Sequence, residues 1–598
     1  MRFVLAIVCF VLAAASIGLG IAQRTVFALP NETSASVTDI DTSAKVTVID
    51  GETLNSFPRS QTVSISGAKT IFAAYGRTSD VNAWVGDVSR NDITMNDEGE
   101  FVSTLTPGSG EDLPSPEGSD LWYLDYTKDT ALRITINVPE DVSLIIMSDG
   151  VAPAPSNVSV TWPLDNSTPW AMPLVVGGAI VLLLGLALLF WAITHMRSAR
   201  GPRRRSQKMP KLPRQPRYKP SRVRPKAIEG RPSKKAIEAP RGRRSSRAGM
   251  VAALPIVLVG SLLLGGCSTD FLAGTNGTDQ PVASASPKAD ADAVAVESPA
   301  VTKPQASRII ARISAITTEA DVDRDAEVAA TRLAGPALDL RLANYKMRKA
   351  DKTIKQLSPI PAGPVELTLP QQSDAWPRTV FAIVQNDVDE EGQKFYVAIV
   401  MIQDDARSQY KVHYAITLEP GAVIPKVASA EVGTGRLGND IGLLTIAPSD
   451  LAMAYSDVLM KDTESENYDL FEAEGDSLRV SVGLAAKKAA QKKLPSTARL
   501  IYESALGNGQ TVALTTNDNG ALVAVNLNEI ETVKAVEAGA AVNAPKSVKS
   551  LLGKSLSTKG IKATYGDQLL FYVPPIESGG KIILLGYSQG LIAASELK

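Results

Sequence analysis

The sequence predicts a multi-domain membrane protein with two soluble regions. The first is an all-β, sandwich-like domain near the N-terminus, and the second is an α+β region at the C-terminus. Three observations predict this: a few apolar segments interrupt a chain of ordinary composition, a strongly basic block separates two of them, and the regions around them show different hydrophobic periodicities. The length of 598 residues allows several domains of about 100–200 residues each.

The first apolar segment is Phe3–Ala22. About 20 apolar or small residues match the length of a membrane-spanning helix and exceed the roughly 7–15 residues of a signal-peptide core. Gly20, Ile21 and Ala22 form a tolerable cleavage site for a signal peptidase. We therefore expect residues 1–22 to be a signal anchor or a signal peptide.

Residues 31–165 alternate as the half-buried strands of an antiparallel sheet do. In Leu132–Val138 every second residue is apolar, and turn-forming residues separate about eight such runs. This pattern predicts an extracytoplasmic β-sandwich. The domain contains no His and no Cys, and its acidic residues are scattered. We therefore expect it to serve interaction or spacing.

The second apolar segment, residues 170–195, predicts a transmembrane helix. Its core carries no charge, and its length suits a bilayer. Trp170 and Trp191 lie near its two ends, where aromatic rings favour the membrane interface.

Residues 196–250 predict a disordered, cytoplasmic loop. Between Arg197 and Arg247 lie 20 of the chain's 62 Lys/Arg residues and only two of its 63 Asp/Glu residues. Such a Pro- and Arg-rich stretch cannot bury a core, and the positive-inside rule places it in the cytoplasm. Both soluble regions then lie outside the cytoplasm. The loop is expected to attract anionic lipid head groups, and no nucleic acid is expected as a partner.

The third apolar segment, residues 251–266, is short for a membrane crossing and ends in Leu264-Gly265-Gly266-Cys267. A basic stretch, a short apolar stretch and small residues before a cysteine form a lipobox, so Cys267 is the lipidation candidate. A short transmembrane helix that ends at a cysteine by chance is the alternative. Residues 268–305 are rich in Ala, Pro, Ser and Asp and predict a flexible tether.

The C-terminal region shows a pattern of helices followed by strands, and this pattern occurs two times along the sequence. The pattern predicts one α+β unit over 306–435 and a second over 440–598, and Asn517–Gly520 predicts a hairpin turn. Helices packed on a curved sheet in this order resemble the NTF2-like or cystatin-like class. That likeness concerns the fold and does not indicate a function.

Sequence motifs do not identify a catalytic, cofactor-binding or metal site. With two histidines, His195 and His413, and two cysteines, the chain lacks the ligands of a zinc site. Asp321–Asp325 and Asp387–Gly392 both depart from the spacing of a calcium loop. Gly586–Gly590 reads G-Y-S-Q-G, but no Asp or His follows it, as a hydrolase elbow would require.

Several longer stretches resemble an uncharacterised family of actinobacterial envelope membrane proteins. They are SDLWYLDY, WPLDNSTPW, PKLPRQPRYKP, LPQQSDAWPRTVFA, YKVHYAITLEP and YGDQLLFYVPP, and they are spread over nearly the full length. The resemblance implies a domain of unknown function. Some members carry a loose glycosyltransferase label, which the residues of this chain do not support.

Three functions remain open from the sequence. We expect a non-enzymatic membrane protein or lipoprotein that binds or scaffolds a cell-envelope component, such as a glycan, a lipid or another exported protein. The first alternative is an enzyme of envelope glycan biogenesis, for which Asp387, Asp389, Asp404 and Asp405 would be the residues to test. The second is a membrane protein fused to a lipoprotein and separated from it by cleavage before Cys267.

Overall fold

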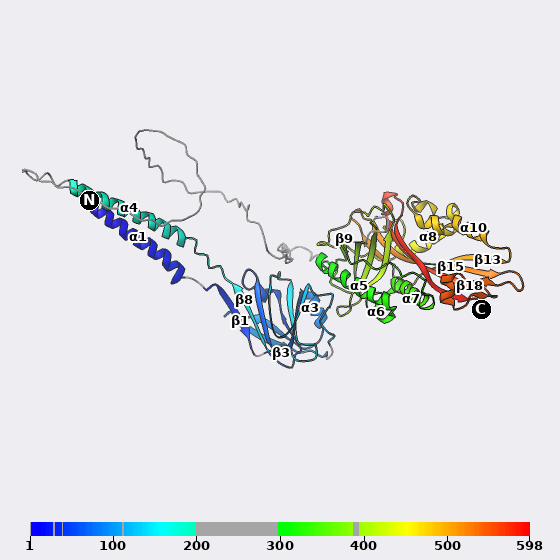
Figure 1. The fold of residues 1–598 in the computed structure, drawn as a ribbon, viewed down its shortest axis with the longest axis horizontal. Helices are drawn as coiled ribbons and strands as arrows, with labels where there is room; N and C mark the ends of the chain where they lie inside the picture. Colours follow the sequence, from blue (N-terminus) through cyan, green and yellow to red (C-terminus); the bar gives the residue numbers. More distant parts are fainter. Residues whose placement is uncertain (1, 28–29, 39, 111–112, 199–296, 387–393) are drawn as a thin grey trace, which may run out of the picture. The chain divides into compact units, whose positions relative to one another are not determined.

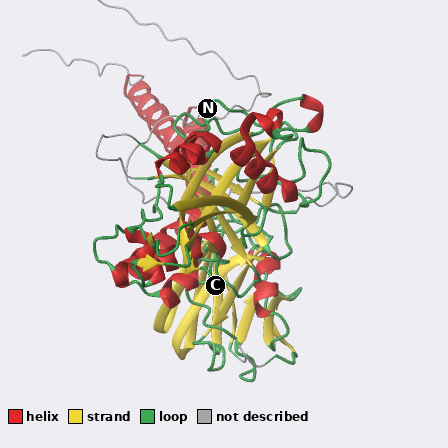
Figure 2. Ribbon diagram, turned by 90° about the vertical axis from the view of Figure 1, so that its right-hand side faces the viewer, coloured by secondary structure: helices red, strands yellow, loops and turns green. Residues whose placement is uncertain are grey.

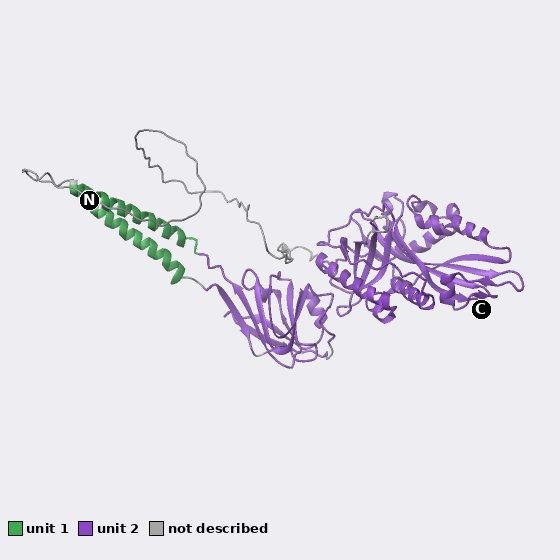
Figure 3. Ribbon diagram, in the orientation of Figure 1, with its two compact units in different colours: residues 1–28, 168–280 green, residues 29–167, 281–598 purple. Residues whose placement is uncertain are grey.

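The computed structural model describes residues 2–27, 30–38, 40–110, 113–198, 297–386 and 394–598 (Figure 1). The chain divides into two compact units. The helical unit contains residues 1–28 and 168–280, and the sheet unit contains residues 29–167 and 281–598 (Figure 3). The expectations for the basic loop, for the third apolar segment and for Cys267 fall outside the described residues.

The helical unit contains two helices that are long and apolar enough to span a membrane, α1 (Arg2–Thr25) and α4 (Ala171–Ser198). They run antiparallel, because Gly20 near the end of α1 faces Ala171 at the start of α4, whereas Gly185 faces Cys9. By its position, α1 also suits a signal sequence.

Small residues at intervals of seven form the contact between α1 and α4. Their side chains are buried while most neighbouring apolar residues are exposed. In α1 the buried residues are Ala6, Ala13 and Gly20, and in α4 they are Ala171, Gly178, Gly185 and Ala192. Because lipid offers no hydrophobic incentive for helices to associate, close backbone approach at small residues is what stabilises such a pair.

The first part of the sheet unit, residues 30–167, is the β-domain. Its strands are β1 (Glu32–Val37), β2 (Val46–Ile49), β3 (Gln61–Arg77), β4 (Arg90–Met95), β5 (Phe101–Thr106), β6 (Leu124–Ile136), β7 (Val142–Met147) and β8 (Asn157–Pro163). Two short helices, α2 (Gly51–Leu54) and α3 (Thr78–Val85), flank β3 in sequence.

The β-domain is a nearly closed, barrel-like sheet, which corrects the expected all-β sandwich. Its strand order is β1-β8-β3-β7-β2-β4-β5 with β6 also paired to β3, β1 comes close to β5, and β2 and β4 are parallel. The cause is the length of β3, whose 17 residues pair with three strands and so curl one sheet around a shared core. The expected alternation is confirmed, since Leu132, Ile134 and Ile136 are all buried.

The second part of the sheet unit, residues 297–598, is the C-terminal domain. Its helices are α5 (Lys303–Asp323), α6 (Ala326–Arg332), α7 (Gly335–Ala350), α8 (Pro448–Lys461), η1 (Asp462–Glu464), η2 (Tyr468–Leu470), α9 (Ser477–Val482), α10 (Leu484–Lys493), α11 (Lys546–Leu552) and η3 (Ile576–Ser578). Its strands are β9 (Val365–Pro370), β10 (Arg378–Gln385), β11 (Tyr396–Gln403), β12 (Lys411–Leu418), β13 (Ala498–Leu506), β14 (Val512–Thr515), β15 (Ala521–Ala535), β16 (Val542–Asn543), β17 (Leu556–Ser557), β18 (Ile561–Val573) and β19 (Ile583–Glu596).

The two expected α+β units share a single sheet. The strand order β13-β15-β18-β19-β12-β11-β10-β9 is antiparallel throughout, and the last strand, β19, joins the two halves by pairing with β12. Figure 2 shows the strands in yellow and the helices in red. One core cluster combines residues of β9–β12 with residues of β14, β15 and β18, so one face of the curved sheet packs on itself. Helices α5–α7 and α8–α9 cover two further clusters on the opposite face.

Local signals set several helix and turn boundaries. Thr302 and Gln305 form a capping box at the start of α5, and Pro336 stands in the first turn of α7. The helical stretch from Ser477 to Lys493 is interrupted at Gly483, where a side chain would meet the backbone of Arg479. The hairpin expected at Asn517–Gly520 is confirmed between β14 and β15.

The glycines of α4 allow a sharp test of the helix pair. At Gly178 an added Cβ would lie 2.6 Å from the Ile17 side chain, whereas at Gly177 nothing lies within 4 Å. Gly178→Leu should therefore weaken the pair by about 1–3 kcal/mol, as overpacking does, while Gly177→Leu should have no effect.

Cross-linking to the native Cys9 measures the pairing. In a Cys267→Ser background, Gly185→Cys should form a disulfide with Cys9 on oxidation, since a Cβ at 185 lies 3.2 Å from the Cys9 Cβ. Gly178→Leu should lower the cross-linked fraction, and Gly177→Leu should leave it unchanged. Equal cross-linking in both variants would show that α1 and α4 do not pack in this way.

Candidate functional site

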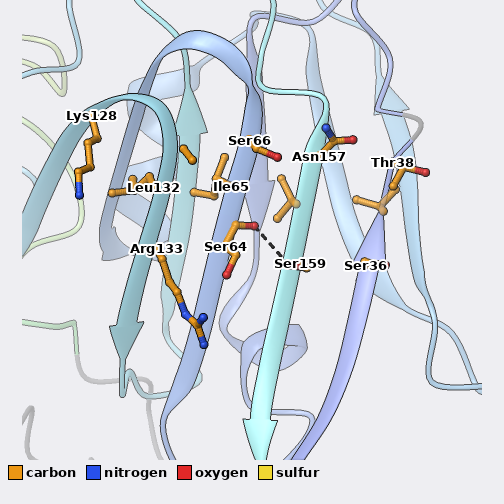
Figure 4. A pocket seen from close by; sticks show the side chains of 13 residues that line it. Ser36, Thr38, Ser64, Ile65, Ser66, Lys128, Leu132, Arg133, Asn157 and Ser159 are labelled. Atoms are coloured by element: carbon orange, nitrogen blue, oxygen red, sulfur yellow. Dashed lines mark hydrogen bonds between the residues drawn. The ribbon is translucent and has the colours of Figure 1, made fainter.

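The β-domain carries a pocket of about 530 Å³ on four neighbouring strands (Figure 4). Its lining comes from β1, β8, β3 and β6 and combines small polar residues with apolar residues and two cations. The lining residues are Ser36, Val37, Thr38, Ser64, Ile65, Ser66, Lys128, Ala131, Leu132, Arg133, Asn157, Val158 and Ser159.

Cross-strand pairing places the hydroxyl groups of the pocket in rows. Ser36 pairs with Ser159, Ser159 with Ser64, and Ser64 with Arg133. The next row on this face consists of Ser34, Thr161, Thr62 and Thr135. Paired residues point to the same side of a sheet, so these residues form a hydroxyl face opposite the apolar core.

Two cations lie on one side of the hydroxyl face. Lys128 and Arg133 both belong to β6, are exposed and line the pocket; in Figure 4 Arg133 lies beside Ser64, and Lys128 lies further along β6, beyond Leu132. The Ser159 hydroxyl donates to the Ser64 carbonyl at 3.5 Å, at the limit of a hydrogen bond, so it stays available to a ligand. Hydroxyl donors and acceptors beside two cations suit a polyhydroxylated ligand with acidic groups.

The C-terminal domain contains a second cluster of polar groups, buried beneath α10. Lys487 of α10 lies 2.6 Å from Glu529 of β15, and Gln589 of β19 donates to the same carboxylate at 3.2 Å. Asp567 of β18 pairs with Gln589 in register and is fully buried, with the Gln589 side chain beside its carboxylate. One lysine thus faces two buried carboxylates.

Burial and the neighbouring Glu529 raise the pKa of Asp567 well above its ordinary value. Burial and the same neighbour also raise the pKa of Glu531, which lies two residues along β15. The arrangement favours a protonated, neutral Asp567. The single cation of the cluster, Lys487, then balances the charge of Glu529. Sequence reasoning missed these residues because they are spread over one helix and three strands, and only the strand pairing and α10 bring them together.

His413 is a buried residue of strand β12 with a structural role. It is the extra residue where the pairing of β11 and β12 shifts register, and it is buried beside Gly335 at the start of α7. Burial lowers its pKa despite the nearby Asp404, so the folded chain favours the neutral imidazole.

The other sequence motifs have local structural roles. Gly586–Gly590 lies inside β19, whereas a nucleophile elbow needs a turn between a strand and a helix. Asp321 is buried and accepts hydrogen bonds from Arg341 and from the Tyr345 hydroxyl, which ties α5 to α7. Asp325 caps the start of α6.

The acidic residues that an enzyme would use are only partly described. Asp387 and Asp389 fall outside the described residues. Asp405 accepts hydrogen bonds from the backbone of Arg407 and Ser408 in the turn after β11, and Asp404 is exposed beside it. Among the described residues, no group of three or more His, Cys, Asp or Glu side chains could hold a metal ion.

The two tryptophans expected at the membrane interface are exposed at opposite ends of α4. Trp170 immediately precedes the helix and is 69% exposed, and Trp191 lies in its last two turns and is 55% exposed. Their contact with a membrane interface stays a prediction.

Removing the charge of Asp567 should stabilise the C-terminal domain. A carboxyl whose pKa is raised by folding contributes stability below its unfolded pKa and loses it as the pH rises through the folded pKa. Asp567→Asn should therefore raise the melting temperature at pH 8 by roughly 2–4 °C, or about 1 kcal/mol. No gain is expected at pH 4. Calorimetry on the full chain measures both, with the exposed Asp469→Asn as control. A lower melting temperature at pH 8 would contradict the buried-acid interpretation.

His413 should make the fold sensitive to mild acid. Its contribution to stability is full above the unfolded pKa of about 6.5 and is lost as the pH falls, because the unfolded chain binds the proton more readily. Denaturation midpoints measured between pH 7.5 and 5.5 should fall more steeply in the wild type than in His413→Gln. Parallel curves would show that another group titrates.

Comparison with known proteins places the C-terminal domain in a family. The model of the family "Domain of unknown function (DUF8094)" matches residues 297–596, just over half of the chain. No curated protein and no solved structure matches the chain, so the likeness to NTF2-like or cystatin-like folds and the actinobacterial origin both stay predictions. The chain belongs to the DUF8094 family.

Proposed function

We propose that this protein is a membrane-anchored binding protein of the cell envelope, and that the β-domain pocket binds an acidic glycan. The pocket carries the proposal. It offers hydroxyl groups in register on three strands, with Arg133 and Lys128 of the fourth strand, β6, at one side. Many weak hydrogen bonds with two charge-assisted contacts are the usual chemistry for holding a polyhydroxylated anion without reacting with it.

The anchoring part of the proposal rests on α1 and α4. Both are apolar and largely exposed along their outer faces, as lipid contact requires. Their small-residue contact supports a first helix that is retained as an anchor. The basic residues after α4 favour a cytoplasmic loop over 197–250, and the two soluble regions then lie outside.

Binding of a soluble acidic oligosaccharide to the full chain in detergent tests the proposal. A uronic-acid oligosaccharide should bind more tightly than a neutral maltooligosaccharide, and more weakly as the salt concentration rises. Replacing Arg133 and Lys128 together by Ala should raise the Kd at least about tenfold, since two lost charge-assisted contacts amount to more than 1.4 kcal/mol.

A matched control removes charge elsewhere on the same unit. Lys492 and Lys493 are exposed at the end of α10, in the C-terminal domain. Replacing both by Ala changes the net charge by the same amount and should leave the Kd unchanged. Equal weakening in both double variants would indicate unspecific attraction, and unchanged binding in the pocket variant would exclude this pocket.

A further inference from the structure

The β-domain and the C-terminal domain meet within the sheet unit at an interface built on buried charge. The interface is formed by α3 and residues 116–123 of the β-domain and by side chains of α5, α6, β10 and the turn before β12 of the C-terminal domain. About 130 residues of sequence, most of them outside the described residues, separate the two domains.

The first buried group centres on Asp80 of α3. Its carboxylate accepts from Arg77 of its own domain at 2.9 Å and from Arg378 of the C-terminal domain at 2.7 Å. Arg77 also donates to Asp374 at 3.1 Å. Two arginines and two aspartates therefore balance in charge, and Arg378 and Asp80 are almost inaccessible to water, at 0% and 1% exposure.

Further contacts hold the two arginines of this group in place. The Arg378 guanidinium lies over the Trp376 ring, 3.7 Å from its centroid, and donates to the Asp374 carbonyl. Burial works against the charged form of Arg77, but the Asp80 carboxylate outweighs it and raises the pKa of Arg77. Arg77 therefore stays charged inside the interface.

The second buried group centres on Asp120, whose carboxylate is fully buried. It accepts from Arg332 at 2.5 Å and from the Tyr410 backbone N–H at 2.9 Å, and Arg312 lies 3.7 Å away. All three partners belong to the C-terminal domain. Without that domain, this carboxylate would lose every partner that the structure gives it.

Backbone carbonyls of the β-domain accept further hydrogen bonds from side chains of the C-terminal domain. Gln305 donates to the Asp120 carbonyl at 2.6 Å, and Arg407 donates to the Trp84 and Val85 carbonyls at 2.8 and 2.9 Å. Arg308 binds the Trp122 and Tyr123 carbonyls. The apolar cluster of Trp84 and Trp122 also includes Ala406 of the C-terminal domain.

We propose that the two domains form one folded body that stays together when the chain is cut between them. Breaking a buried, hydrogen-bonded ion pair leaves an uncompensated charge, and this interface contains two such groups. Cleavage before Cys267 would then give a complex of a membrane protein and a lipoprotein instead of two independent products. The inference stands apart from the glycan-binding proposal, because it concerns a different surface.

A cleavable full chain tests the inference. A protease recognition sequence inserted between residues 270 and 290 of the Cys267→Ser protein allows complete cutting after purification in detergent. A C-terminal affinity tag should then recover the N-terminal fragment at physiological and at high salt, because buried pairs are screened little. The C-terminal fragment lacks all three apolar segments, so a shared micelle cannot explain recovery.

Variants assign the association to the buried charges. Asp80→Ala with Asp120→Ala should lower recovery of the N-terminal fragment at least tenfold, whereas removing the exposed pair Lys546–Asp351 should have no effect. Separation of the unmutated fragments in either salt would overturn the inference. Circular dichroism of the uncut variants shows whether both domains are still folded, and full recovery with a folded double variant would likewise overturn it.

Discussion

Two aspartates of the β-domain, Asp80 and Asp120, depend on arginines that follow them by more than 200 residues in the sequence. A buried carboxylate is costly unless it is paired and hydrogen-bonded, so Asp120 requires the C-terminal domain to be in place, and Asp80 gains Arg378 from it beside its own Arg77. The β-domain supplies mainly carboxylates and carbonyls and the C-terminal domain mainly guanidinium groups, with the Arg77–Asp374 pair in the opposite direction. This division explains why the sheet unit is compact although its two parts are far apart in the chain.

Local patterns predicted much of the fold, and non-local pairing accounts for the errors. The alternation in β6, the hairpin before β15 and the apolar helices α1 and α4 are all encoded by neighbouring residues. The closure of the β-domain sheet depends on which strands pair with β3. The single C-terminal sheet depends on the pairing of β19 with β12. Hydrophobic periodicity shows which face of a strand is buried, but it does not predict which strands pair with β3 or with β19.

The candidate sites were harder to predict than the fold. Ser36, Ser64 and Ser159 are the polar half of ordinary alternating strands, and only the register brings them into one row. Glu529 and Asp567 likewise lie on strands of mixed composition, so each acid alone suggests an exposed position. One signal was available: the runs SASV and SISG repeat serine at every second position, and NVSV alternates polar and apolar residues in the same way.

The polar character of the interdomain interface also matters during synthesis. Residues 30–167 leave the ribosome roughly 130 residues before the C-terminal domain begins, which corresponds to on the order of ten seconds of translation. Over that time an apolar docking surface would be exposed and prone to aggregate, whereas the Asp120 carboxylate is hydrated by water until Arg332 arrives, and Asp80 has Arg77 of its own domain beside it. The charged contacts therefore keep the unfinished chain soluble at the surface that will later be buried.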